Sequence, residues 1–346
     1  MSKKITVLIC DDSALVRQVL DSVLSADPQI EVVGTAQNPL IAREMIKQLN
    51  PDVLTLDIEM PEMDGLSFLE KIMALRPMPV VMISSLTQKG TAQSLRALEM
   101  GVCDIIGKPT YDLQANFKEM SHEITSKVKA AAGARIRPSP HLIRKVKSRE
   151  TQLSKVSLIA IGASTGGVAA IKDVLPLLPR HSPPILIVQH MPEAYTAGFA
   201  ERMDLASRVK VLESEDGMEL KSGRAILAQG GCHSRVENRG GKLFIKHGMD
   251  AEVSGHRPSV DAAFESIAKN VAGNVVAVIM TGMGRDGARG MLELRRKGAF
   301  TIGQSQDSCI VYGMPKVAME VGGVVKEVSL SRIASEIEAY CWPETK

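Results

Sequence analysis

Short apolar runs alternate with amphipathic stretches over the first 120 residues of the chain. The runs occupy residues 5–10, 31–33, 53–56, 80–84 and 104–106. Between them apolar residues recur at helical intervals, as at Leu15, Val19 and Val23, which predicts helices with one buried face. Five strands that alternate with helices predict a doubly wound α/β domain with a parallel sheet, because right-handed crossovers place helices on both faces.

A second alternation begins near residue 158 and continues to the end of the chain. Its apolar runs occupy residues 158–161, 185–188, 225–227, 243–245, 275–280 and 300–302. Between the two alternations the pattern gives way to Ala, Gly, Lys and Arg, and Pro138 and Pro140 exclude a continuous helix. We therefore expect two doubly wound parallel-sheet α/β domains, residues 1–125 and 154–346, joined by a linker over residues 126–153 that is helical at its first end.

Length and charge agree with this division. The chain has 346 residues, more than one hydrophobic core usually organises, and 45% of them are hydrophobic, as in ordinary folded proteins. Nine Lys or Arg and one acid lie between Lys127 and Lys155, so this segment carries +8 and the remainder −5. Prolines interrupt the basic segment and aromatic residues make up only 3% of the chain, which favours a solvated tether over a nucleic-acid surface.

Cysteine usage and hydropathy indicate a cytoplasmic protein. Five scattered cysteines without a CxxC pair predict reduced thiols rather than a disulfide framework or a zinc site. The largely apolar run that precedes Asp11 is too short for a signal peptide. No apolar run approaches the ~18 residues of a membrane span, so we expect no membrane insertion.

Acidic residues follow two of the predicted strands in the first domain, Asp11 and Asp12 after the first and Asp57 after the third. The ends of parallel strands meet at one sheet edge, where three carboxylates would repel one another without a cation such as Mg²⁺. A carboxylate beside Mg²⁺ can accept a phosphoryl group, with Lys108 neutralising its charge and Ser84 donating a hydrogen bond. Acidic strand ends also occur as solvated loops or helix caps, so the prediction depends on all five positions together.

These positions resemble the receiver domains of two-component response regulators. The resemblance covers residues 4–120 and rests on Asp11-Asp12, the run DIEMPEMDG at residues 57–65, Ser84 and Lys108-Pro109. It implies a flavodoxin-like fold and phosphorylation of Asp57 by a histidine kinase. It also implies Mg²⁺ held among Asp11, Asp12, Asp57 and the carbonyl of Glu59.

One position departs from this resemblance. Many receivers carry an aromatic residue three positions before the lysine, and its rotamer reports phosphorylation, whereas this chain has Ile105. We therefore do not expect a switch that relies on an aromatic side chain, and a movement around Ser84 is the remaining route.

The first predicted strand of the second domain runs into a glycine-rich turn, IGASTGG at residues 161–167. An apolar helical stretch follows this turn. This order would expose Ser164 at a helix N-terminus, where free backbone N–H groups can stabilise an oxyanion. A phosphate-binding loop and a bare turn are the competing interpretations. However, no lysine follows Gly166 and Gly167 as a Walker motif requires, and Ser164 replaces the second glycine of a dinucleotide fingerprint.

A serine nucleophile needs a base and an acid that orients it. His190 follows the run at 185–188 and Asp286 follows the run at 275–280, so both are expected at the sheet edge that carries Ser164. His233 and His256 are also candidate bases, and sequence position does not decide among the three histidines. The chain order Ser, His, Asp differs from the Ser, Asp, His order of the α/β-hydrolases.

The second domain resembles the catalytic domain of the chemotaxis protein-glutamate methylesterases/protein-glutamine glutaminases, whose two-domain architecture the whole chain matches. The motifs are IGASTGG at 161–167, QHMP at 189–192, HRPSVD at 256–261 and TGMGRDG at 281–287. The resemblance implies a Rossmann-like α/β fold without a cofactor, Ser164 as nucleophile, His190 as base and Asp286 as orienting acid. It also implies backbone oxyanion donors at Thr165 and Met283. The loop AQGGCH at 228–233 departs from the usual Ala-Pro-Gly-x-x-His of the family.

Together the two resemblances imply a phosphorylation-activated serine esterase that hydrolyses glutamyl methyl esters, and deamidates specific glutamines, on bacterial chemoreceptors. The implied partners are a chemotaxis histidine kinase and the cytoplasmic domains of methylated receptors, with peripheral association with receptor arrays and no nucleic acid. The unphosphorylated receiver is expected to cover the active-site edge. The alternatives are a DNA-binding response regulator that uses the basic segment and a non-catalytic binding module. The lack of a compact helix-turn-helix pattern opposes the first and the Ser/His/Asp set opposes the second.

Overall fold

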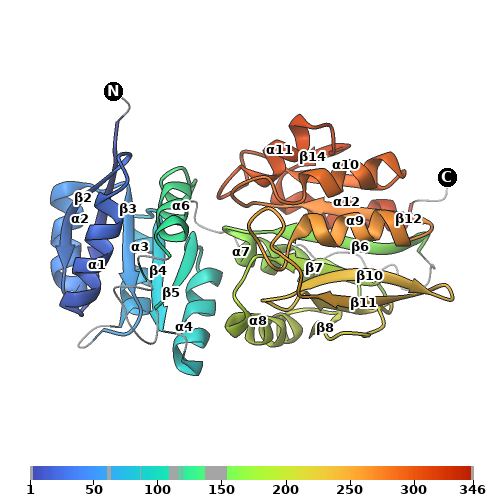
Figure 1. The fold of residues 1–346 in the computed structure, drawn as a ribbon, viewed down its shortest axis with the longest axis horizontal. Helices are drawn as coiled ribbons and strands as arrows, with labels where there is room; N and C mark the ends of the chain where they lie inside the picture. The colour runs from blue at the N-terminus through green and yellow to red at the C-terminus, as the bar shows by residue number, and fades with distance from the viewer. Residues whose placement is uncertain are drawn as a thin grey trace. The chain divides into compact units, whose positions relative to one another are not determined.

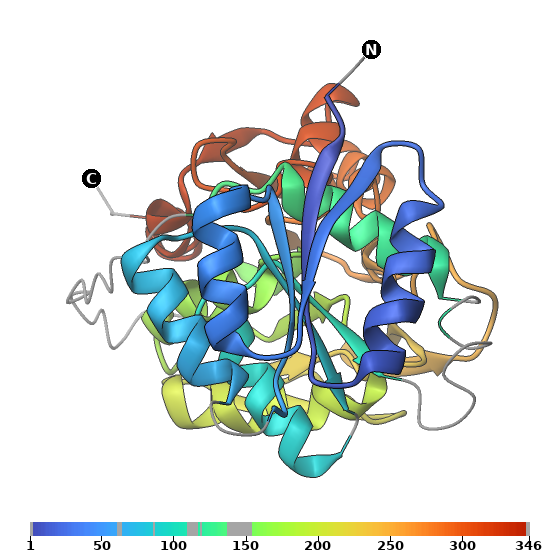
Figure 2. The same ribbon diagram turned by 90° about the vertical axis from the view of Figure 1, so that its left-hand side faces the viewer.

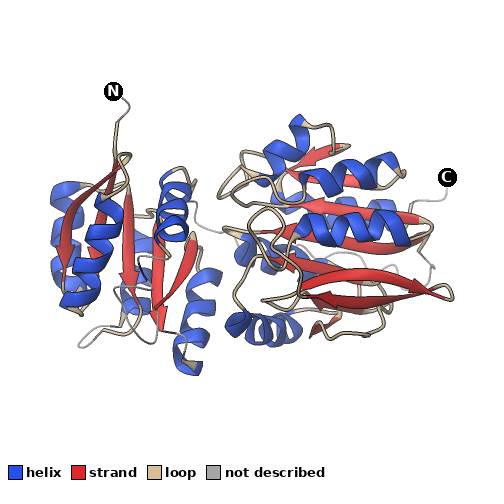
Figure 3. Ribbon diagram, in the orientation of Figure 1, coloured by secondary structure: helices blue, strands red, loops and turns tan. Residues whose placement is uncertain are grey.

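The computed structural model describes residues 3–60, 64–85, 87–108, 117, 120–136 and 154–343. The chain divides into two compact units, Met1–Pro140 and His141–Lys346. Each unit is a sheet with helices packed on it, as Figures 1 and 3 show. Within the described ranges no helix is both long and apolar enough to cross a membrane.

The first unit contains the five predicted strands in one parallel sheet of order β2-β1-β3-β4-β5. The strands are β1 (Ile5–Cys10), β2 (Ile30–Ala36), β3 (Val53–Asp57), β4 (Val80–Ser85) and β5 (Asp104–Lys108). Every residue of β3 is buried, as expected for a central parallel strand covered on both faces. The prediction of a doubly wound α/β domain is confirmed.

Five described helices cover this sheet: α1 (Ala14–Ser25), α2 (Pro39–Leu49), α3 (Gly65–Leu75), α4 (Gln88–Glu99) and α6 (Ser121–Ala132). Figure 2 shows α1 and α6 on one face of the sheet and α2, α3 and α4 on the other. Helix α6 continues past residue 125, the expected end of the first domain, and buries Ile124 and Val128. Residues 137–153 of the predicted linker, Pro109 and residues 61–63 of the acidic motif lie outside the described residues.

The second unit contains a seven-stranded parallel sheet of order β14-β13-β12-β6-β7-β9-β8. Its strands are β6 (Val156–Ala163), β7 (Ile185–Gln189), β8 (Lys210–Glu213), β9 (Arg224–Leu227), β12 (Asn274–Ile279), β13 (Phe300–Gln304) and β14 (Lys326–Val328). The three central strands β12, β6 and β7 are the ones followed by Asp286, Ser164 and His190. The sheet order therefore brings the ends of these three strands side by side.

One expected strand of this sheet lies elsewhere. Residues 243–245 belong to β11 (Lys242–Gly248), which pairs antiparallel with β10 (His233–Arg239) in a separate two-stranded sheet. Val236 and Ile245 face each other and are buried, whereas the adjacent Lys246 is exposed and Arg235 and Glu237 are half-buried, the alternation of a ribbon covered on one side. A run of three apolar residues carries no information on strand direction, so the sequence did not separate it from the parallel strands.

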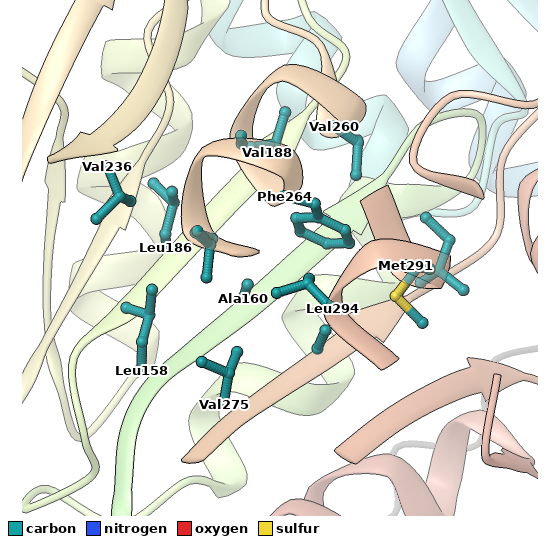
Figure 4. Packing of buried hydrophobic residues seen from close by; sticks show 14 of the residues in the cluster. Leu158, Ala160, Leu186, Val188, Val236, Val260, Phe264, Val275, Met291 and Leu294 are labelled. Atoms are coloured by element: carbon teal, nitrogen blue, oxygen red, sulfur yellow. The ribbon is translucent and has the colours of Figure 1, made fainter. Parts of the chain in front are cut away.

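Six helices and one 3-10 turn accompany the second sheet: α7 (Gly167–Val174), η1 (Leu175–Leu177), α8 (Glu193–Ala206), α9 (Val260–Asn270), α10 (Ala288–Arg296), α11 (Met314–Glu320) and α12 (Leu330–Cys341). Figure 4 shows Phe264 of α9 among buried side chains of the central strands and of α10. A side chain at Gly162 would come within 2.4 Å of Val260, so this glycine lets the N-terminus of α9 approach the end of β6. The close approach places residues 259–261 beside the end of β6, which Ser164 directly follows.

All five cysteines are free and buried. Burial raises the pKa of the thiols of Cys10, Cys103 and Cys341 to about 12, and raises those of Cys232 and Cys309. A thiol with a raised pKa is a poor nucleophile, because the thiolate is the reactive form. The cysteines therefore pack as small apolar residues.

Candidate functional sites

An acidic cluster lies at the carboxyl ends of β1 and β3 in the first unit. One carboxylate oxygen from each of Asp11, Asp12 and Asp57 lies within 4.8 Å of the others. Lys108, the last residue of β5, places its Nζ 2.8 Å from Asp11 Oδ2 and 2.8 Å from Asp57 Oδ2. The structure thus brings together four of the predicted phosphorylation-site residues at one sheet edge.

Burial controls the charge of this cluster. It raises the pKa of Asp57 to about 6 even though Lys108 opposes the shift, and it also raises the pKa of Asp11. The two aspartates in turn raise the pKa of the Lys108 ammonium against its own burial. Three carboxylates with one ammonium leave a net negative, oxygen-rich site, and this donor set fits Mg²⁺.

Ser84 is buried and bonded toward α4. Its Oγ lies 2.7 Å from the Oγ of Ser94 and 3.4 Å from the carbonyl of Gly90, to which Ser94 also donates at 2.7 Å. To donate to a phosphoryl group, the Ser84 hydroxyl must therefore give up a contact with α4. Ile105 is buried, and its carbonyl accepts a hydrogen bond of 2.6 Å from Lys127 of α6.

In the second unit Ser164 directly follows β6 and begins the turn into α7. Gly166 takes the left-handed conformation, φ +77°, and Gly167 N–H donates to the Ser164 carbonyl at 2.7 Å. A side chain at Gly166 would also contact Ile310, so two requirements favour glycine here. Ser164 itself has no positive φ. The turn of this unit therefore differs from the strained nucleophile elbow of α/β-hydrolases.

Two neighbouring side chains hold the main chain at Ser164. Gln189 Nε2 donates to the carbonyls of Ser164 and His190, each at 3.0 Å, and so ties the end of β6 to the end of β7. Thr281 accepts the Ser164 N–H on its carbonyl at 3.0 Å, while its hydroxyl donates to the Thr165 carbonyl at 3.0 Å. Gln189 and Thr281 belong to the motifs QHMP and TGMGRDG, but no pattern in the sequence assigned either side chain a role.

His190 pairs with Asp286. Its main-chain N–H donates to the carbonyl of Ala163, next to Ser164, and its Nε2 lies 2.8 Å from Asp286 Oδ2. The Nδ1 atom is buried and has no hydrogen-bond partner among the described residues. The carboxylate therefore selects the tautomer with the proton on Nε2, and leaves the lone pair of Nδ1 available to accept a proton.

The N-terminus of α9 surrounds the Asp286 carboxylate. Oδ1 accepts hydrogen bonds from Ser259 Oγ at 2.8 Å and from Asp261 N–H at 3.0 Å, and Oδ2 accepts one from Val260 N–H at 2.6 Å. Burial opposes ionisation, but the bond and charge of His190 together with these donors hold the pKa of Asp286 below its usual value. Asp286 is thus a buried, ionised and fully bonded carboxylate.

The other two candidate bases have different environments. His233 is completely buried, with Nε2 at 3.1 Å from the Ala251 carbonyl and Nδ1 accepting the Ser259 N–H at 3.2 Å. Both of its nitrogens therefore bond main chain, and His233 supports the Ser259 turn. His256 stacks on the ring of His190, with centroids 3.7 Å apart.

The two expected oxyanion donors flank the serine. Thr165 follows it in the turn, and Met283 follows Gly282, where an added Cβ would lie 2.7 Å from Ser164 Cβ. In the described part of the chain, the N–H of Met283 donates to no other group. Its position and its open hydrogen-bonding capacity suit a donor to a negatively charged oxygen.

Asp261 supplies a stability prediction. Burial, aided by the charge of Asp286, raises its pKa to about 6, although its carboxylate accepts the Gly290 N–H at 2.8 Å. Between about pH 4 and about pH 6 the unfolded chain releases this proton while the folded chain keeps it, so the free energy of unfolding falls as the pH rises. Above pH 6 the ionised Asp261 lowers the free energy of unfolding by on the order of 3 kcal/mol.

Asp261→Asn, which can still accept the Gly290 hydrogen bond, is expected to raise the Tm above pH 6 by roughly 6 to 12 °C and to change it little near pH 4. Thermal unfolding across this pH range measures the effect. The control is Asp250→Asn, because Arg235 lowers the pKa of Asp250 to about 2 and its removal should not stabilise the protein. Equal Tm values for wild type and Asp261→Asn at every pH would contradict the prediction.

Comparison with known proteins identifies a family for each unit. Residues 7–117 match the family model of the response regulator receiver domain, and residues 159–337 match that of CheB methylesterase. A protein-glutamate methylesterase/protein-glutamine glutaminase 2 of Cupriavidus pinatubonensis is 48% identical over 340 residues, which cover 97% of this chain and 96% of the relative.

Two further comparisons point the same way. The protein-glutamate methylesterase/protein-glutamine glutaminase of Salmonella typhimurium is 48% identical over 337 residues, 97% of each chain. The crystal structure of the Thermotoga maritima CheB methylesterase catalytic domain covers 53% of this chain and 97% of its own, at 33% identity and a TM-score of 0.51.

Proposed function

This chain belongs to the CheB methylesterase family, with a response regulator receiver domain in its first half, and on that premise we propose how its residues carry out the reaction. It is a protein-glutamate methylesterase/protein-glutamine glutaminase controlled by a receiver. The DNA-binding alternative is not favoured, because the second unit is a parallel-sheet α/β domain similar to the methylesterase catalytic domain. The substrates are glutamyl methyl esters, and specific glutamines, of chemoreceptors.

Ser164 is the nucleophile and His190 is its base. The Oγ atom of Ser164 attacks the ester carbonyl carbon, and its proton passes to Nδ1 of His190, the ring nitrogen without another partner. This assignment reverses the two ring nitrogens relative to the serine protease template, in which Nε2 faces the serine. The observation that carries the proposal is the 2.8 Å bond between His190 Nε2 and Asp286, which leaves Nδ1 for the nucleophile.

Asp286 stabilises the imidazolium that forms when His190 takes up the proton. Its carboxylate remains ionised because the Ser259 hydroxyl and two main-chain N–H groups of α9 bond it. These donors are in place before the reaction, so no reorganisation is needed when the charge develops. Asp286 thus acts by orientation and charge and does not take the proton itself.

The N–H groups of Thr165 and Met283 bind the oxyanion of the tetrahedral intermediate. Collapse of this intermediate breaks the bond to the methoxy oxygen, which takes the proton from His190 and leaves as methanol. Water, deprotonated by His190, then hydrolyses the glutamyl-Ser164 ester and restores the serine. With a glutamine side chain the same steps release ammonia in place of methanol.

The receiver unit controls this activity through Asp57. A histidine kinase transfers a phosphoryl group to the Asp57 carboxylate, and Lys108 pairs with the added negative charge. Mg²⁺, held by Asp11, Asp12, Asp57 and the Glu59 carbonyl, would offset the charge of the cluster and of the phosphoryl group. The Ser84 hydroxyl exchanges its hydrogen bond to the Gly90 carbonyl of α4 for one to a phosphoryl oxygen, which couples phosphorylation to α4 in the absence of an aromatic residue at position 105.

Methanol release from membranes that contain methylated chemoreceptors tests the proposed function. The full chain is expected to release methanol, and faster when Mg²⁺ and a small-molecule phosphodonor are present. Unmethylated receptor membranes are the control for substrate. If methylated membranes yield no methanol above that control, with or without the phosphodonor, the proposed function is wrong.

Asp57→Asn is expected to abolish the stimulation by the phosphodonor and to keep the basal rate. The amide nitrogen of asparagine is a poor acceptor for a phosphoryl group, whereas Ser164 and His190 are untouched by the change. The basal and stimulated rates of methanol release measure this. Asp21→Asn, which removes a half-buried carboxylate from α1, is the matched control and should remain stimulated. Full stimulation of Asp57→Asn would rule out phosphorylation at this residue.

A further inference from the structure

The base of the site is covered on one face by a second histidine. The rings of His190 and His256 are stacked, with centroids 3.7 Å apart and planes inclined by 20°. One nitrogen of His190 is bonded to Asp286 and the side chain is only 7% exposed. The contact with His256 involves the ring face and not a nitrogen of His190, so it does not use the Nδ1 atom, which has no hydrogen-bond partner among the described residues.

A strained turn presents His256. Val253 and His256 exchange two main-chain hydrogen bonds, of 3.1 and 3.2 Å, across Ser254 and Gly255. Both intervening residues have positive φ, +56° for Ser254 and +78° for Gly255, as in a type I′ turn. Apart from Asn50 in the first unit, Ser254 is the only described non-glycine residue with positive φ. Such strain persists only where the surroundings hold it, and it is frequently found at functional sites.

The surroundings of this turn are well bonded on both sides. In the segment before the turn, the carbonyls of Met249 and Asp250 accept hydrogen bonds from Arg257 Nη1. The Ala251 carbonyl bonds His233. In the segment after the turn, the Arg257 carbonyl accepts a hydrogen bond of 3.1 Å from the N–H of Gly231. The turn is therefore anchored to the segment that contains His233. The Nδ1 atom of His233 accepts a hydrogen bond from the Ser259 N–H, beside Asp286.

We propose that His256 is a positioning residue for the base of the esterase. An imidazole held through one nitrogen can still rotate about that hydrogen bond and swing its other nitrogen away from the serine. The stacked ring of His256 removes this freedom and excludes water from one face of His190. Small displacements of a reacting group can cost 10²-fold in rate, so a loose base would lower kcat without a comparable change in binding. This role rests on the function proposed above.

Two substitutions of His256 separate the stacked face from the ring nitrogens. His256→Ala removes the ring and is expected to lower kcat for methanol release by about 10- to 100-fold, with KM within about twofold of wild type. His256→Phe restores a flat ring without nitrogen and should recover most of the lost kcat. The rate at which a small serine-reactive phosphonate labels Ser164 should follow the same order, since it reports activation of the nucleophile without receptor binding.

A matched control is His181→Ala. His181 also packs its ring against an aromatic residue, Trp342 at 5.1 Å, but takes no part in the Ser164 site. The kcat of His181→Ala, and the rate at which the phosphonate labels Ser164 in it, should equal those of wild type. Melting temperatures of all variants report whether a loss of rate accompanies a loss of fold.

Gly255→Ala tests the turn without altering any ring. An added Cβ meets no atom within 4 Å, so the substitution acts only through the strain of a positive φ. We expect a several-fold loss of kcat at unchanged KM. Gly217→Ala is the control, because Gly217 has nearly the same φ, +77°, and equally open surroundings, and it lies outside the turn. It should retain the wild-type kcat.

Two outcomes would overturn the proposal. Wild-type kcat in His256→Ala would show that the base needs no stacked partner. Equal loss in His256→Ala and His256→Phe, with both variants folded, would assign the effect to a nitrogen of His256 rather than to its face. Failure of the proposed function would look different, because the wild-type chain itself would then release no methanol and Ser164 would not react with the phosphonate.

Discussion

Ser164→Ala is expected to lower methanol release from methylated receptors by at least about 10⁴-fold. The substitution removes the atom that forms the covalent intermediate, and water held at the same place would lack its preorganised attack. The residual rate of methanol release should be the rate that the oxyanion donors at Thr165 and Met283 support on their own. The initial rate of methanol release, measured with the phosphodonor present, quantifies the loss.

The fold should tolerate this change. The hydrogen bonds that hold residue 164 use its main chain: the N–H donates to Thr281, and the carbonyl accepts from Gly167 and Gln189. Alanine preserves all three. Ser157→Ala, in the strand β6 that precedes residue 164, is the matched control. It removes only an exposed hydroxyl bond to the Ala272 carbonyl and should keep the rate of wild type. A Ser164→Ala variant with more than about one per cent of wild-type activity would not fit a serine nucleophile.

Asp286→Asn is expected to lower kcat by about 10⁴-fold. In the wild-type protein the Asp286 carboxylate accepts hydrogen bonds on both oxygens. Ser259 and Asp261 donate to one oxygen, and Val260 and His190 donate to the other. An asparagine has one oxygen and one donor group for the same positions. If the amide donor faces His190, Nε2 must accept and the ring proton moves to Nδ1, which can then no longer take the proton of Ser164.

In the other orientation the amide donor faces the N–H of Asp261, and the charge that stabilises the imidazolium is still lost. Both orientations therefore reduce kcat, and KM should change little because Asp286 is buried behind His190. The measurement is the separate determination of kcat and KM. Asp204→Asn is the control, since Asp204 also accepts a main-chain N–H and pairs with a lysine but lies away from the site. An Asp286→Asn variant with wild-type kcat would exclude Asp286 as the orienting acid.

Much of the architecture could be predicted from the sequence. Apolar runs of four or more residues identified the central strands, because strands buried on both faces have few polar residues. The strands β8, β10 and β14 were not predicted. Their sequences are KVLE, HSRVENR and KEV, and their polar composition resembles that of loops. In these strands, tertiary pairing rather than local pattern decides the structure.

The site could be predicted only in part. The rule that strand ends converge placed Ser164, His190 and Asp286 at one edge, and the structure shows that their strands are neighbours. The choice among His190, His233 and His256 depends on loops whose conformation is set by long-range hydrogen bonds, such as that between His233 and Ser259. No local pattern carries that information. The same applies to the contact between Ser84 and Ser94, which joins a strand to a helix ten residues away.

The burial of all five native cysteines has a practical consequence for following this enzyme at work. Thiol-directed fluorophores and spin labels react with accessible thiolates, and the native thiols supply almost none, because burial both shields them and raises their pKa. A cysteine introduced on an exposed helix face would therefore take up the label against a silent background. Pairs of such labels, one in each unit, would report their separation before and after phosphorylation without prior removal of any native residue.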